Sequence, residues 1–228
     1  MAADIILMAD DGHKFSAAFS PSQTDLQKRG LVIIQEIFGV NMHIRSLCSR
    51  FSELGFTSIA PALFDRVQQD VSLDYSEESV LLGRDLRNKL DWKKPLLDIQ
   101  ASIDHLQQIG CDEIHVIGYC FGGSLAWLSA TRLQSLTSVI SYYGGNIIDF
   151  LDESPKCPIM LHFGETDSAI PLEDVTKLQQ KYPDLPVHIY PQAGHGFNCD
   201  LRASFNASAA QDALVRSLEF IDSQSKYD

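Results

Sequence analysis

Short continuous apolar runs alternate along this chain with segments of helical periodicity, and this alternation constrains the fold more than any other feature. The run Leu31-Val32-Ile33-Ile34 has no polar face, which is typical of a strand buried on both sides in a parallel sheet. Parallel strands need crossover connections, usually helices, and those helices cover the two faces of the sheet. The sequence therefore predicts an α/β fold with a mainly parallel central sheet and helices on both faces.

The N-terminal segment departs from this alternation and predicts a hairpin. Residues 4–8 and 14–19 are β-prone and flank Asp10-Asp11-Gly12, and Asp-Gly between such runs is a strong turn signal. After the hairpin, the chain predicts strands at 31–34, 56–60, 114–119, 137–142, 158–163 and 187–190, and helices at 43–54, 95–109, 124–133, 172–182 and 208–221.

Residues 63–91 form a long segment outside the alternation. They are polar and acidic and show no clear strand. Because open α/β sheets bind ligands beyond the carboxyl ends of their strands, we interpret residues 63–91 as a lid-like excursion over those ends. With 228 residues, 45% of them hydrophobic, the chain is long enough for one well-buried core and short for two, which favours a single domain over 1–228.

The charge and the cysteines restrict the partners and the compartment. A formal net charge of -12 argues against a nucleic-acid partner, because affinity for a phosphate backbone comes from clustered Lys and Arg. No stretch approaches the length needed to cross a bilayer, and the N-terminus lacks the regions of a signal peptide. The cysteines are odd in number and form no C-x-x-C pair, unlike a disulfide framework: Cys48, Cys111, Cys120, Cys157 and Cys199. We therefore expect a soluble cytoplasmic protein with no membrane partner.

The pentapeptide Gly118-Tyr119-Cys120-Phe121-Gly122 lies where the strand predicted at 114–119 runs into the next helix. This is the layout of a nucleophile elbow, in which glycines around the central residue allow a tight turn that exposes the nucleophile above the sheet. At a helix start, the helix dipole would favour the Cys120 thiolate. The alternative is a glycine-rich turn around a small buried cysteine, and the pentapeptide alone does not decide between the two.

Two further residues complete a catalytic arrangement with Cys120. A thiol nucleophile needs a base to accept its proton and a third group to orient that base. Asp167 follows the apolar strand that ends at Phe163, and His195 lies in a loop after the last strand. Nucleophile, acid and histidine thus occur in the chain order of α/β-hydrolases, each after a predicted strand. Taken singly, Asp167 reads as a turn former and His195 as a loop histidine, but together they predict a triad.

A dinucleotide-binding turn is the competing interpretation of the elbow, and its glycines do not fit. Gly118, Gly122 and Gly123 do not give G-x-G-x-x-G, and Cys120 stands where a glycine would let the backbone approach a pyrophosphate. None of the histidines shows metal-ligand spacing such as H-E-x-x-H, so we interpret His115 and His162 as structural. The sequence therefore implies no cofactor and no metal.

The chain resembles the dienelactone hydrolase family, which is carboxymethylenebutenolidase-like and has the α/β-hydrolase fold. The resemblance is carried by Gln35-Glu36-Ile37-Phe38-Gly39-Val40-Asn41, the motif from Gly118 to Gly123, Asp167 in its loop, and Gly194-His195-Gly196-Phe197. It runs from the N-terminal hairpin to the last helix. The heptapeptide and the cysteine elbow are specific in combination.

The resemblance implies a role for each matching residue. Cys120 would be the nucleophile, His195 the base and then the acid, and Asp167 the group that holds the imidazole. Glu36 would hydrogen-bond the resting thiol and help activate it when substrate binds; the alternative is a solvated acid after a strand. A carboxylate that faces a thiol in a dry site disfavours the thiolate. The backbone N–H groups of Ile37 and Phe121 would form the oxyanion hole.

The substrate-binding positions depart from the family pattern. Members that cleave dienelactone carry one arginine four residues after the catalytic histidine and another on the excursion, and the two grip the substrate carboxylate. In this chain Cys199 holds the first position, and the second falls near Val80. Arg202 lies three residues further on, and the excursion offers Arg84 and Arg87. Arg84 and Arg202 are therefore candidate substrate-binding residues, although each can equally be a solvated charge, and dienelactone itself is in doubt.

We expect a hydrolase that opens an ester or lactone bond of a small molecule through an acyl-Cys120 intermediate, acting as a monomer or a weak homo-oligomer. The alternative is a catalytically idle protein of the α/β-hydrolase fold, whose pocket binds a small ligand as a sensor. Stoichiometric acyl transfer to Cys120 would separate the two.

Overall fold

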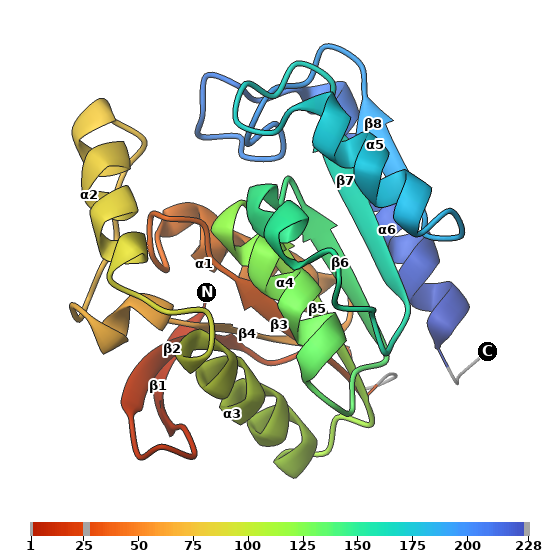
Figure 1. Cartoon of the computed structure of the whole chain (residues 1–228). Helices are drawn as coiled ribbons and strands as arrows, with labels where there is room; N and C mark the ends of the chain where they lie inside the picture. Colours follow the sequence, from red (N-terminus) through yellow and green to blue (C-terminus); the bar gives the residue numbers. More distant parts are fainter. Residues whose placement is uncertain (1, 25–27, 226–228) are drawn as a thin grey trace. The chain divides into compact units, whose positions relative to one another are not determined.

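The computed structural model describes residues 2–24 and 28–225. The chain forms two compact units, Met1–Val116 and Ile117–Asp228, and strand β5 (Glu113–Tyr119) runs across the boundary between them (Figure 1). Within the described residues, no helix combines the length and the apolar composition that a bilayer-spanning helix requires.

The first unit begins with the predicted hairpin. β1 (Ala3–Met8) pairs antiparallel with β2 (Lys14–Ser20), and the turn between them holds Gly12 at a φ of 81°. β2 pairs antiparallel with β4 (Phe56–Pro61), which pairs parallel with β3 (Arg29–Ile34). All six residues of β3 are buried, as the continuous apolar run predicts for a strand inside a parallel sheet.

Two amphipathic helices of the first unit pack against these strands. α1 (Met42–Glu53) packs against β4, and α3 (Lys94–Gln108) packs against β3 and β4. Asn41 caps α1, because its side chain accepts a hydrogen bond from the backbone N–H of Ile44. Pro95 lies in the first turn of α3, where its missing N–H costs no helical hydrogen bond. Both helices begin and end within two residues of the sequence prediction.

The excursion at 63–91 contains a helix that the sequence analysis did not predict. A short 3-10 helix, η1 (Leu63–Arg66), is followed by an antiparallel bridge between Gly39 and Ser72, and then by α2 (Glu77–Asn88). Ser76 caps α2 by accepting from the backbone N–H of Ser79, and two acidic residues in its first turn favour the helix dipole. This cap was the sequence signal for the helix.

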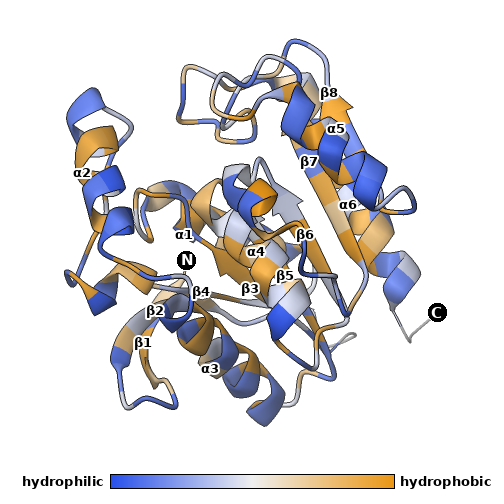
Figure 2. Ribbon diagram, viewed as in Figure 1, coloured by the Kyte–Doolittle hydropathy of each residue, from blue (hydrophilic) through white to orange (hydrophobic). Residues whose placement is uncertain are grey.

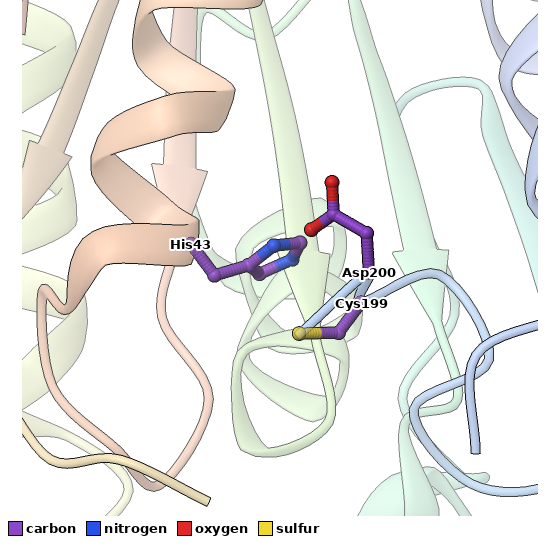
Figure 3. A group of neighbouring side chains, drawn as sticks. All are labelled: His43, Cys199 and Asp200. Atoms are coloured by element: carbon purple, nitrogen blue, oxygen red, sulfur yellow. The ribbon is translucent and has the colours of Figure 1, made fainter. Parts of the chain in front are cut away.

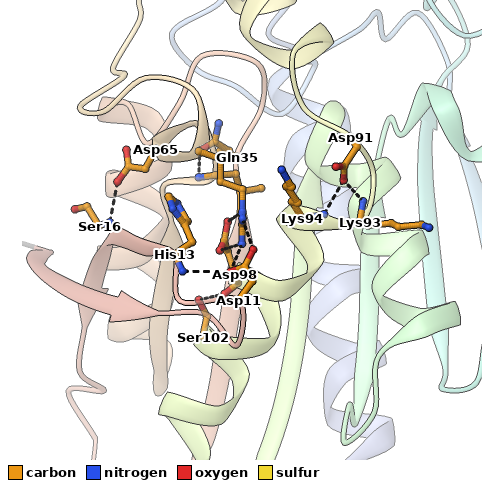
Figure 4. A network of polar contacts seen from close by, with 12 residues as sticks. Asp11, His13, Ser16, Gln35, Asp65, Asp91, Lys93, Lys94, Asp98 and Ser102 are labelled. Atoms are coloured by element: carbon orange, nitrogen blue, oxygen red, sulfur yellow. Dashed lines mark hydrogen bonds and ion pairs between the residues drawn. The ribbon is translucent and has the colours of Figure 1, made fainter.

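A buried ion pair fastens η1 to α3. The Arg66 guanidinium donates to both carboxylate oxygens of Asp98, each over 2.7 Å, and also to Asp11 of the hairpin turn over 2.8 Å. Figure 4 shows the side chains of Asp11 and Asp98 in this network of polar contacts. Burial raises the pKa of Asp98 to about 6, against the opposing effect of the hydrogen bond from Arg66. Because the Asp98 side chain is fully buried, this carboxylate depends on Arg66 for its charge compensation.

The second unit contains a parallel sheet in the order β6 (Ser138–Tyr142), β7 (Ile159–Gly164) and β8 (Val187–Tyr190). α4 (Phe121–Arg132) packs against β6, and α6 (Ala207–Gln224) packs against β6 and β7. The remaining helices are η2 (Gly145–Phe150) and α5 (Leu172–Lys181). In Figure 2, β7 is largely hydrophobic, whereas α5 presents a mostly hydrophilic surface.

α4 begins at Phe121, three residues earlier than predicted, because its first turn includes two glycines. A Cβ on Gly123 would lie 2.4 Å from the carbonyl oxygen of Tyr142. A Cβ on Gly118 would lie 1.9 Å from the carbonyl oxygen of Gly122. Helix α4 can therefore start directly after Cys120 and pack closely on the end of β6 only because these positions lack side chains.

Candidate active site

Cys120 lies in a strained turn between β5 and α4. Its φ of 56° and ψ of -114° are unusual for a residue with a side chain. The backbone N–H of Cys120 donates to the carbonyl of Tyr142 over 3.0 Å, and the N–H of Ser124 donates to the carbonyl of Cys120 over 3.2 Å. These bonds hold the turn in place, and the Cys120 side chain remains partly accessible to solvent.

Asp167 and His195 lie in two neighbouring loops that contact each other. Asp167 follows β7 and His195 follows β8, two strands that pair in parallel. The backbone N–H of Thr166 donates to the carbonyl of Ala193 over 2.9 Å, and a Cβ on Gly164 would lie 2.3 Å from the same carbonyl oxygen. The absence of a side chain at Gly164 therefore lets the two loops meet.

The three predicted triad residues lie in hydrogen-bond contact. Nδ1 of His195 is 2.8 Å from Oδ2 of Asp167, and Nε2 of His195 is 3.1 Å from Sγ of Cys120. The other carboxylate oxygen of Asp167 accepts from the backbone N–H of Ala169 over 2.8 Å, which fixes its orientation. Because a carboxylate only accepts, Nδ1 of His195 carries a proton and Nε2 faces the sulfur.

The charges of the two partners change the protonation of His195. Burial of the imidazole lowers the pKa of His195, but the negative charges of Cys120 and Asp167 and their hydrogen bonds outweigh this effect and raise the pKa to about 10. The arrangement therefore favours an imidazolium at neutral pH, with its Nε2 facing the sulfur of Cys120. Such a pair can attack a carbonyl carbon and then protonate a leaving group.

Tyr143 is a residue of this site that the sequence analysis missed. Its buried ring lies 5.1 Å from the His195 ring and 5.4 Å from the Phe197 ring, measured between centroids. Its φ of 39° is also unusual for a residue with a bulky side chain. The ring limits where the imidazole can rotate. No signal in the sequence could have identified Tyr143, because a tyrosine at a strand end carries no motif.

The heptapeptide residues Glu36 and Ile37 lie in the first unit, directly after β3. Glu36 is 1% exposed, and its Oε2 accepts a hydrogen bond from the Tyr75 hydroxyl over 3.3 Å. Gly83 of α2 lies against the carbonyl of Ile37, so closely that a Cβ there would be 2.2 Å from the oxygen. Phe121, in the second unit, is the first residue of α4. The catalytic roles of Glu36, Ile37 and Phe121 stay predictions.

The candidate substrate-binding arginines differ in their surroundings. Arg84 is exposed on α2, whereas Arg202 is half-buried. The Arg202 guanidinium lies across Gly196, where a Cβ would be 2.4 Å from its Nη1. Cys199, which holds the family's arginine position, is fully buried, while the adjacent Asp200 is exposed (Figure 3). Arg202 therefore lies close to the predicted triad, because it contacts Gly196 and Gly196 directly follows His195.

The buried histidines outside the predicted triad include His162 and His43. His162 is fully buried, with Nδ1 2.8 Å from the Tyr190 hydroxyl and Nε2 3.1 Å from the Ser217 hydroxyl. Burial holds the pKa of His162 well below its usual value, so its ring is neutral. His43 is buried in the first turn of α1.

Comparison with known proteins places this chain in a family. The dienelactone hydrolase family matches residues 16–225. A Synechocystis protein named "Putative carboxymethylenebutenolidase" is 33% identical over 213 residues, which cover 86% of each chain.

Two solved structures show the fold. The crystal structure of a Klebsiella pneumoniae protein named "Putative Dienelactone Hydrolase" has a TM-score of 0.85 at 24% identity. The match covers 97% of this chain and 98% of that one. The α/β-hydrolase GrgF from Penicillium has a TM-score of 0.72 at 12% identity, and covers 98% and 99%. These likenesses confirm the α/β-hydrolase fold predicted from the sequence. The match over 16–225, together with the Synechocystis relative, shows that the chain belongs to the dienelactone hydrolase family.

Proposed function

We propose that this chain hydrolyses an ester or lactone bond of a small molecule, with the Cys120 thiolate as the nucleophile and an acyl-enzyme as the intermediate. The observation that carries the proposal is the continuous contact from Asp167 through His195 to Cys120, with distances of 2.8 Å and 3.1 Å. Membership of the family supports the reaction class.

In the acylation step, Sγ of Cys120 bonds to the carbonyl carbon and the carbonyl electrons move to the oxygen. The backbone N–H groups of Ile37 and Phe121, by resemblance to the family, stabilise this oxyanion. The intermediate then collapses, and the bond between carbon and the leaving oxygen breaks. Imidazolium His195 gives its Nε2 proton to the leaving alkoxide, so that an alcohol and a neutral imidazole result.

In the deacylation step, the neutral His195 accepts a proton from water through Nε2. The resulting hydroxide adds to the thioester carbon, and Cys120 leaves as a thiolate when the carbon–sulfur bond breaks. The product is a carboxylic acid, and the imidazolium and thiolate are restored. For a lactone, the alcohol and the acid belong to one molecule. Asp167 keeps Nδ1 protonated and the ring oriented in both steps.

Glu36 opposes the thiolate in the resting enzyme, a role that we take from the family resemblance. Glu36 is 1% exposed, which argues against the alternative of a solvated acid and supports a role inside the protein. By that resemblance the carboxylate would face the thiol, and one negative charge disfavours a second beside it. Substrate binding would then release the thiolate by drawing the carboxylate away.

We propose that the substrate is neutral. The family's arginine position holds Cys199, a buried thiol that offers no positive charge. A net charge of -12 further disfavours anions. Arg84 on α2 and Arg202 beside Gly196 are the candidates for a carboxylate contact, and substrate charge therefore tests this part of the proposal.

The decisive experiment compares hydrolysis of an activated neutral ester by the wild-type protein and by Cys120→Ala. We expect turnover to be lost with the fold unchanged by circular dichroism, because Cys120 is not a core residue. Cys157→Ala is the matched control, since Cys157 is a half-buried thiol outside the triad. Mass spectrometry of the acid-quenched reaction should find the acyl group on Cys120. Unchanged turnover in Cys120→Ala would exclude the mechanism. A wild-type protein that shows neither turnover nor acylation of Cys120 would favour an idle binding protein.

A further inference from the structure

Tyr75 connects the excursion to the buried carboxylate of Glu36. It lies between the Gly39–Ser72 bridge and the start of α2, and its side chain is half-buried. The Tyr75 hydroxyl is 3.3 Å from Oε2 of Glu36 and 3.1 Å from Nδ2 of Asn41. Neither the sequence motif nor the proposed mechanism gives Tyr75 a role.

The amide of Asn41 fixes the direction of these hydrogen bonds. Oδ1 of Asn41 accepts from the backbone N–H of Ile44 as the cap of α1, over 3.3 Å. Nδ2 therefore faces the excursion, where it donates to the carbonyl of Leu73 over 3.1 Å and to the Tyr75 hydroxyl. The hydroxyl accepts from Asn41 and has a single proton to donate, and the Glu36 carboxylate can only accept. The proton of Tyr75 consequently points at Glu36.

The backbone around Tyr75 is held against the heptapeptide, so that this donor is preorganised. The N–H of Leu73 donates to the carbonyl of Phe38 over 2.9 Å. The rings of Phe38 and Tyr75 meet edge to face, with centroids 4.6 Å apart. Gly39 has a φ of 75°, and a Cβ there would lie 2.0 Å from the carbonyl oxygen of Val71. A side chain at Gly39 would separate the two segments.

We propose that Tyr75 is a positioning residue for Glu36: its hydroxyl orients the carboxylate, so that the restraint on Cys120 depends on the segment at 71–76. The inference rests on the proposed function, in which Glu36 opposes the thiolate. A hydrogen-bond donor holds a carboxylate in one orientation, and a carboxylate held in place opposes a thiolate more strongly than a displaced one. Loss of the Tyr75 hydroxyl should therefore weaken the restraint.

The test is the rate at which iodoacetamide alkylates Cys120 across the acid limb of its pH profile, with the site identified by peptide mass spectrometry. Tyr75→Phe removes the hydroxyl and keeps the ring that packs against Phe38. We expect it to alkylate roughly threefold to tenfold faster than the wild type on the acid limb. Glu36→Gln should be faster still. The double variant should match Glu36→Gln, because Tyr75 acts only through Glu36.

Tyr182→Phe is the matched control for Tyr75→Phe. The hydroxyl of Tyr182 donates to the carbonyl of Leu151 over 2.8 Å and has no part in the contact with Glu36, so its alkylation profile should equal that of the wild type.

The possible contrary outcomes are distinct. If Tyr75→Phe follows the wild-type profile while Glu36→Gln is faster, Tyr75 does not position the carboxylate, and the proposed function stands. If the two rate increases multiply in the double variant, the residues act independently and the inference is overturned. If Glu36→Gln itself follows the wild-type profile, Glu36 exerts no restraint and the inference falls with it. The nucleophile is tested separately, by hydrolysis in Cys120→Ala.

Discussion

Gly164 and Ala193 approach so closely that a Cβ on Gly164 would lie 2.3 Å from the carbonyl oxygen of Ala193. This approach joins the loop that carries Asp167 to the loop that carries His195. The position of the imidazole relative to the carboxylate thus depends on a glycine that takes no part in the chemistry.

Gly164→Ala should therefore reduce the turnover number by about a hundredfold, because the two loops must separate and displace His195. KM should change less than the turnover number. Gly145→Ala is the matched control, since its Cβ would have no neighbour closer than 3.4 Å. Steady-state kinetics with a neutral ester makes the comparison, and equal turnover numbers in the two variants would contradict this account of the site.

His195→Ala should lower the turnover number by roughly three orders of magnitude or more, because base and nucleophile act as a unit. For the same reason, the double variant His195→Ala with Cys120→Ala should lose little beyond either single variant. The measurement is the initial rate of ester hydrolysis above the uncatalysed background. Losses that multiply would mean that the residues do not share a mechanism.

The pH dependence follows from the raised pKa of His195, about 10 in the folded chain against an ordinary value of 6.5. Because the folded value is the higher one, the ion pair contributes its full stability below pH 6.5 and loses it as the pH rises through about 10. The imidazolium acid is lost over the same range, so kcat/KM should fall there. Asp167→Asn removes one of the two anions and should move this alkaline limb to lower pH. Superimposable profiles would contradict the assignment, and circular dichroism at each pH excludes unfolding.

Arg66→Met should reduce the free energy of unfolding by about 3 kcal/mol, because it leaves the buried Asp98 carboxylate without its partner. The Arg66 side chain is 6% exposed and that of Asp98 is fully buried. Arg132→Met removes a comparable ion pair with Glu153, in which the side chains of Arg132 and Glu153 are 29% and 34% exposed. It should reduce the free energy of unfolding by less than about 1 kcal/mol. Urea denaturation provides both values. Similar losses in the two variants would show that burial of the Arg66 pair has no energetic consequence.

A neutral ester should have a kcat/KM at least equal to that of a matched carboxylated substrate. A bidentate contact from arginine contributes about 1.5–3 kcal/mol, and the buried Cys199 cannot supply it. The two substrates are compared at low and high salt in the wild type, Arg84→Ala and Arg202→Ala. A strong preference for the anion that disappears in Arg202→Ala would instead assign the carboxylate contact to this displaced arginine.

The sequence was sufficient for most of the strands and helices, and for the choice of three residues that lie in hydrogen-bond contact. Apolar runs such as 31–34 have no polar face and so become buried strands wherever they pair, and an Asp-Gly turn forms a hairpin from local geometry alone. Cys120, Asp167 and His195 could be chosen because each follows a predicted strand, and the carboxyl ends of parallel strands share one edge of a sheet. Helix α2 was missed, although its cap at Ser76 was visible in the sequence.

Tertiary structure alone decided how the chosen residues are held. The approach of Gly164 to Ala193, the Tyr143 ring beside His195 and the Tyr75 hydroxyl on Glu36 join segments that are distant in the chain. No periodicity or motif encodes such contacts. They depend on which positions lack a side chain where two loops meet, and on the direction in which the neighbouring side chains point. Chain order thus indicated which groups are candidates for the reaction, whereas close packing determined their distances and orientations.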